Sequence, residues 1–131
     1  MTYAATKPLD FQNALMRALQ RSICFYYLIE NEELFKNSRE RHLMNARQVF
    51  QYLAHVKLKI PSPVVGHFSN RDHATVLHSK KIINDQLDIQ NKEVRVDIAN
   101  IMQIYKRPSK YGIAWFIIKK CIKDVFEVLT K

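Results

Sequence analysis

The residues with the most distinctive chemistry in this sequence form one short run, Arg71-Asp72-His73-Ala74-Thr75. Arginine can donate two hydrogen bonds to guanine, aspartate can accept one from cytosine, and small or hydroxyl-bearing side chains can contact a thymine methyl group. If the run begins a helix, the free backbone N–H groups there also favour a phosphate. The run is therefore a candidate for contacting bases in a DNA major groove. The competing interpretation is structural: Asp72 caps its own helix and pairs with Arg71.

The segments around this run fit a helix-turn-helix, in which the first residues of the second helix meet the base edges. We expect a short helix that starts at Ser62 or Pro63 and ends at Phe68, because proline is favoured in a first helical turn. A turn at Ser69 and Asn70 follows, and then a helix over 71–88. Apolar spacing predicts four buried residues in that helix: Val76, Leu77, Ile83 and Leu87.

Hydrophobic periodicity predicts further helices on both sides of this motif. One starts at Asp10 as its N-cap and ends near Ile29 or Glu30, and a short turn over 32–35 follows, capped by Asn31. Another covers 43–56 and has an apolar stripe along one face. Arg47, Gln48 and Gln51 lie outside this stripe. The last two cover 91–105 and 113–130. Only two glycines interrupt the chain, Gly66 and Gly112, so the sequence predicts an all-α protein.

Several classes of site are excluded by composition. The two glycines lie too far apart for a GxxxxGK[ST] or GxGxxG loop, so we expect no nucleotide cofactor. The five histidines form no HExxH motif, so we expect no metal, and no Ser-His-Asp grouping predicts an enzyme or a small-molecule substrate. Two unpatterned cysteines and the absence of an apolar N-terminal signal predict a cytoplasmic protein.

The net charge of +9 is concentrated in two parts of the chain. Residues 34–82 carry nine basic residues against two acidic ones, and residues 106–131 carry seven against two. A basic block of this kind suits a polyanion, with nucleic acid as the first candidate and an anionic membrane as the second. A solvated face that only keeps the protein soluble is the alternative.

Two segments of the basic block resemble a known family. RDHATVLHSKKI at 71–82 resembles the RDHTTVLHA-x-x-KI signature of the C-terminal DNA-binding domain of the bacterial replication initiator DnaA. SRERHLMNARQVFQYLA at 38–54 is similar to that family's R-x-R loop followed by an ARQ helix. The resemblance covers about 18–105. It implies a Trp-repressor-like helical bundle over 1–105, without the initiator's ATPase module, and leaves 106–131 as a basic amphipathic helical extension.

The resemblance also implies roles for individual residues. Arg39 falls where the family inserts an arginine into the minor groove, and Asp72, His73 and Ala74 fall where it reads bases in the major groove. Pro63 falls at a base-contacting position at the start of the short helix. Phosphate contacts fall to Arg41, Arg47, Gln48 and Thr75, and we add Arg71 to the base-reading run and His78, Lys80 and Lys81 to the phosphate contacts.

The sequence departs from the family pattern in three places. Ala74 stands where the family has threonine, Ser69-Asn70 stands where it has two glycines, and the segment before the signature is one residue shorter. We expect the loss of the threonine hydroxyl at Ala74 to change which DNA box is recognised.

The sequence as a whole predicts a protein that binds double-stranded DNA at DnaA-box-like sites on the nucleoid, in control of replication initiation or transcription. The alternative is a helical interaction or membrane-peripheral module whose basic surface reads no sequence. The C-terminal helix has three interpretations: it packs on the domain, it forms a homodimer, or it lies on an anionic membrane.

Overall fold

The computed structural model describes residues 9–107, and the expected C-terminal helix at 113–130 lies outside the described residues. Any homodimer through that helix, and the proposed extension at 106–131, therefore remain predictions. In chain order the elements are α1 (Leu9–Tyr27), α2 (Asn31–Leu34), α3 (Arg41–Tyr52), the π-helical turn η2 (Leu53–Lys57), α4 (Ser62–Phe68), α5 (His73–Asp88) and α6 (Lys92–Lys106).

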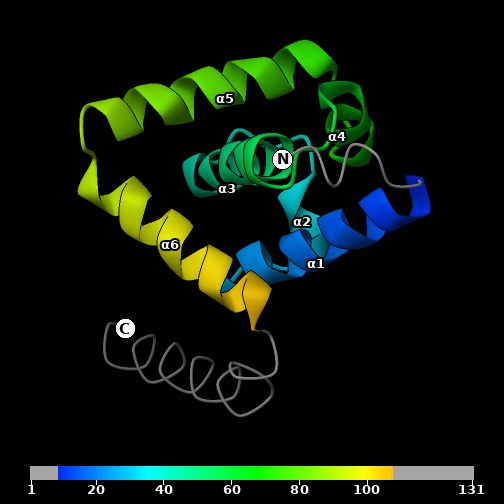
Figure 1. The fold of residues 1–131 in the computed structure, drawn as a ribbon, viewed down its shortest axis with the longest axis horizontal. Coiled ribbons are helices and arrows are strands. Elements are labelled where there is room, and N and C mark those ends of the chain that lie inside the picture. Colours follow the sequence, from blue (N-terminus) through cyan, green and yellow to red (C-terminus); the bar gives the residue numbers. More distant parts are fainter. Residues whose placement is uncertain (1–8, 108–131) are drawn as a thin grey trace.

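Helix α3 lies near the centre of the molecule, with α5, α4, α1 and α6 arranged around it (Figure 1). It packs against α5 and α1, while α5 also packs on α4, and α6 lies against α1. All elements of the described part are helical, so the expected all-α class is confirmed. None of its helices is long and apolar enough to cross a bilayer.

The core lies between α3 and the helices around it, which pack on α3 or on one another. Three aromatic rings meet in it: Phe35 lies edge-on to Phe50 at a centroid distance of 4.9 Å, and Phe68 stacks on Phe50 at 5.7 Å. These rings join the segment after α2 to the central helix and to the end of α4. Fully buried apolar residues around them include Met16, Leu19, Ile23, Leu34, Leu53, Ile60, Val65, Val76 and Ile101.

The ends of α1 and α2 differ from the sequence prediction. Asp10 lies inside the first turn of α1, because Leu9 is already helical, and it is therefore not the N-cap. At the other end, α1 stops at Tyr27 because Leu28 takes a positive φ of 58°, and the N–H of Ile29 then bonds to the carbonyl of Cys24 at 2.9 Å. Asn31 is the first residue of α2 and is not its cap.

One prediction about burial was also wrong, and the burial of two polar residues was not predicted. Leu77 in α5 is 44% exposed, because Val76 and Ser79 are the residues of that helical turn that face α3. Arg47 and Gln51, which fall off the apolar stripe of α3, are buried at 8% and 2% exposure. Both side chains are hydrogen-bonded, which offsets the cost of burying polar groups.

Candidate nucleic-acid interface

Helix α5 begins with exposed side chains. Asp72 is its N-cap: the carboxylate Oδ1 accepts from the backbone N–H of Thr75 at 2.9 Å and from the Thr75 hydroxyl at 2.7 Å. These two bonds lower the pKa of Asp72, which is therefore ionised at neutral pH. His73 and Ala74 are exposed beside it. The start of α5 thus presents an acceptor, an imidazole and a small apolar group to solvent.

The capping role that competed with base reading is confirmed, but the expected pairing of Asp72 with Arg71 is wrong. The Arg71 guanidinium instead donates to backbone carbonyls of Phe35, Lys36 and Asn70. Because only one oxygen of Asp72 serves the cap bonds, capping and contact with a base do not exclude each other.

The turn between α4 and α5 is tight, as the sequence predicts. The N–H of Arg71 donates to the carbonyl of Gly66 at 2.8 Å, and a Cβ at Gly66 would lie 2.7 Å from the Arg71 carbonyl oxygen. Glycine is therefore required at 66 by the close approach of the two backbones. Asn70 has a φ of 58°, a conformation that asparagine tolerates better than most residues. This accounts for one of the two replaced family glycines.

The other replaced glycine, Ser69, belongs to a buried polar network that the sequence analysis missed. Its hydroxyl donates to the carbonyl of Val65 at 2.8 Å and accepts from the Gln51 amide at 3.1 Å. The Gln51 carbonyl oxygen in turn accepts from the Ser79 hydroxyl at 2.6 Å. The three side chains tie α3, the turn and α5 together, and no buried polar side-chain atom in the described part lacks a partner.

The residues expected on the DNA backbone and in the minor groove are mostly exposed. Arg39 lies in the segment before α3, and Arg41 and Gln48 lie on α3 itself. Pro63 is exposed in the first turn of α4, and on α5 His78 and Lys81 are exposed while Thr75 and Lys80 are half-buried. Their contacts with DNA stay predictions.

Arg47, which is also expected on a phosphate, is bonded to the segment before α3. Its guanidinium donates to the carbonyl oxygens of Lys36 at 2.8 Å and Ser38 at 2.6 Å. Burial and the nearby charge of Arg71 lower its pKa. The Arg47 side chain is 8% exposed and bonded to the protein's own loop, and its contact with a phosphate stays a prediction.

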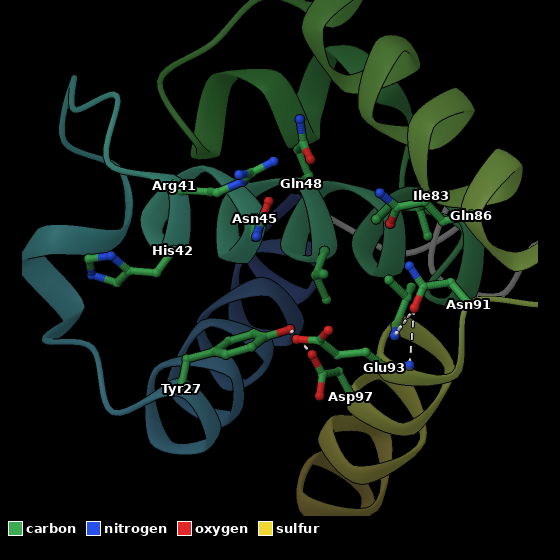
Figure 2. A pocket seen from close by; sticks show the side chains of 12 residues that line it. Tyr27, Arg41, His42, Asn45, Gln48, Ile83, Gln86, Asn91, Glu93 and Asp97 are labelled. Atoms are coloured by element: carbon green, nitrogen blue, oxygen red, sulfur yellow. Dashed lines mark hydrogen bonds between the residues drawn. The ribbon is translucent and has the colours of Figure 1, made fainter.

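A pocket of about 550 Å³ lies beside α3, and acidic residues of α6 on its far side mark the end of the basic surface there (Figure 2). Arg41, Asn45 and Gln48 line it from α3, and Glu93 and Asp97 line it from α6. Asp97 accepts from the hydroxyls of Tyr26 at 2.7 Å and Tyr27 at 3.1 Å, which also joins α6 to α1. Burial, reinforced by the charge of Asp97, raises the pKa of Tyr27. The two carboxylates disfavour a phosphate on the α6 side.

Comparison with known sequences agrees with this architecture. A family model described as the bacterial dnaA protein helix-turn-helix matches residues 16–83, which include α3, the α4–α5 turn and the first part of α5. The chain belongs to this DnaA helix-turn-helix family. The resemblance stated from RDHAT and ARQ is therefore confirmed.

The relatives that this chain matches are chromosomal replication initiator proteins named DnaA. It is 35% identical over 86 residues to the chromosomal replication initiator protein DnaA of Bacteroides fragilis, which is 65% of this chain and 18% of the relative. It is 34% identical over 96 residues to the DnaA of Dechloromonas aromatica, which is 72% of this chain and 20% of the relative. The chain thus corresponds to about a fifth of the length of these DnaA proteins.

Proposed function

We propose that this protein binds double-stranded DNA sequence-specifically at DnaA-box-like sites. The observation that carries the proposal is the exposed start of α5, where Asp72, His73 and Ala74 face solvent. In a helix-turn-helix these first residues of the second helix meet base edges. Membership in the DnaA helix-turn-helix family supports the same assignment.

Fixed geometry behind the reading residues supports the proposal further. Base-specific hydrogen bonds need side chains that are held in position before the DNA arrives. The Gln51–Ser69–Ser79 network and the close contact at Gly66 hold the turn, so the start of α5 is pre-positioned on α3. We infer that Ala74 replaces a hydroxyl with a methyl group that can contact thymine, which alters the preferred box at that position.

Charge supports binding along the DNA backbone. Residues 34–82 carry nine basic against two acidic residues, and Arg39, Arg41, His78 and Lys81 are exposed within this stretch. Each phosphate that is neutralised releases counterions, so affinity should fall with salt at a slope of about 0.9 per contact. We assign Arg39 to the minor groove next to the box and the other three to phosphates.

We infer that the protein acts by binding rather than by catalysis, because the matched family model is that of a helix-turn-helix. Binding at such sites would place it on the nucleoid in the cytoplasm. There it would act in the control of replication initiation or transcription.

Binding to two duplexes tests the proposal. One carries a DnaA box, the other is a scrambled duplex of the same length and composition, and both are titrated at several salt concentrations. We expect the box to bind at least a hundredfold more tightly, since specific DNA-binding domains exceed their non-specific affinity by about 10³ or more. Selection from random duplexes would then define the preferred sequence.

Equal, weak binding to both duplexes would contradict sequence-specific reading. It would favour the alternative of a helical interaction or membrane-peripheral module with an incidental basic surface. Vesicles with and without anionic lipid then separate the membrane form of that alternative from the protein-interaction form.

A further inference from the structure

Two arginines from different parts of the fold converge on the segment that precedes α3. From α3, Arg47 bridges two carbonyl oxygens of this segment, those of Lys36 at 2.8 Å and Ser38 at 2.6 Å. The segment leads directly to Arg39, the residue proposed for the minor groove. The buried guanidinium therefore holds the backbone from which Arg39 projects.

Arg71 reaches the same segment from the turn before α5. Its Nη1 donates to the carbonyl of Asn70 at 2.8 Å and to that of Phe35 at 3.4 Å, and its Nη2 donates to that of Lys36 at 3.2 Å. The Lys36 carbonyl thus accepts from both arginines. A single side chain joins the segment before α3 to the turn that precedes the reading end of α5.

The arrangement needs arginine at both positions. Neither residue takes part in an ion pair within the described part of the chain, so two like charges lie close together with carbonyl oxygens as their partners. A guanidinium presents a rigid planar fork that can bridge two carbonyls, whereas a lysine ammonium is a flexible point charge. The geometry, more than the charge, therefore matters at positions 47 and 71.

We propose that Arg47 and Arg71 are positioning residues that hold 36–39 against the α4–α5 turn, so that Arg39 and the start of α5 meet the minor and major grooves in one fixed register. The proposal rests on the proposed function and adds to it. The protein itself would then fix the distance between Arg39 and the start of α5. Loss of either arginine would leave the position of Arg39 relative to α5 variable.

Minor-groove chemistry separates this role from a phosphate contact. Replacing adenine by 2,6-diaminopurine next to the box adds an amino group to the minor groove and leaves the major-groove edge unchanged. The unaltered protein should lose about tenfold in affinity on the modified duplex, and Arg39→Ala should lose this sensitivity. Arg47→Gln, Arg47→Lys and Arg71→Gln should lose it as well, while keeping most of their preference for box over scrambled DNA.

The control is Arg95→Gln, which removes the same charge from an exposed position on α6 and should retain full sensitivity to diaminopurine. Recovery of normal binding by Arg47→Lys, together with a salt slope lowered by about 0.9 in Arg47→Gln, would overturn the proposal and assign Arg47 to a phosphate. Retained diaminopurine sensitivity in both glutamine variants would overturn it too.

A measurement on the free protein keeps the two proposals separate. Backbone amide order parameters at 36–39 should fall from near 0.85 toward about 0.6 in Arg47→Gln and Arg71→Gln, while those of α3 stay high. Unchanged values at 36–39 would overturn the positioning role even if the box is bound. If wild type shows no box preference, the proposed function fails, and the order parameters alone still decide the positioning role.

Discussion

The start of α5 and the layer directly behind it both contain polar side chains, but those at the start of α5 face solvent and those behind it are buried. His73 and Asp72 are exposed, whereas Gln51, Ser69 and Ser79 behind them are buried and bonded to one another. Buried polar groups that are fully satisfied fix a unique backbone arrangement. The buried polar side chains therefore stabilise the fold, and the exposed ones in front of them are free to contact a ligand.

The same division applies to the arginines. Arg39 and Arg41 are exposed, while Arg47 and Arg71 are bonded to loop carbonyls. Four residues of one type within the basic block thus fall into two groups, which only the fold distinguishes. Mutations in the buried layer should change stability, and mutations at the exposed start of α5 should change recognition.

The largest effect is expected at Gln51. Gln51→Ala removes the acceptor of the Ser79 hydroxyl and the donor to Ser69, and it leaves a cavity in the packed interior. The free energy of unfolding, measured by urea denaturation, should fall by about 3 kcal/mol. The matched control, Gln48→Ala on the half-buried face of the same helix, should change it by less than about 0.5 kcal/mol. Equal losses in both would mean that the network contributes nothing particular.

A smaller, functional effect is expected at His73. His73→Ala should weaken binding to a box duplex by about 1–3 kcal/mol and leave the scrambled duplex and the unfolding free energy unchanged, because the side chain is exposed. His78→Ala, five residues along α5, should weaken both duplexes alike. Isothermal titration of both variants against both duplexes makes the comparison. Identical behaviour of the two variants would remove the distinction between reading and phosphate contact.

The sequence predicted the helix-turn-helix motif more accurately than the ends of the longer helices that surround it. The α4–α5 turn, the Asp72 cap and the family were found correctly, because proline, N-cap residues and the RDHAT run are local signals that need only a few neighbouring positions. The ends of the longer helices were less accurate. The helix predicted over 43–56 ends at Tyr52 and continues as a π-helical turn, a change that depends on packing rather than on a local signal.

The buried polar network could not be predicted from one sequence. The partners of Gln51 lie 18 and 28 residues away, so periodicity records only a polar residue on the edge of an apolar stripe. The same holds for Arg47, which the family resemblance assigns to phosphate and whose carbonyl partners lie 9 and 11 residues back along the chain. Contacts of this kind appear only when the fold brings the segments together.

The smallest effect is expected at Asp72, where the two roles overlap. The hydrogen bonds from Thr75 lower its pKa in the folded protein, so its capping contribution is present above the unfolded-state pKa and is lost as pH falls through the lower, folded-state pKa. Asp72→Asn should therefore lower Tm slightly at pH 7, and the difference from wild type should shrink in acid, where both side chains are neutral.

Asp88→Asn at the opposite end of α5 is the matched control. It removes a carboxylate near the negative end of the helix dipole and should leave Tm unchanged or raise it slightly at pH 7. Thermal melts from pH 7 down to pH 2 follow both variants. A Tm difference for Asp72→Asn that stays constant across this range would contradict the prediction, because it would show that the contribution of Asp72 to the stability of α5 does not depend on its ionisation.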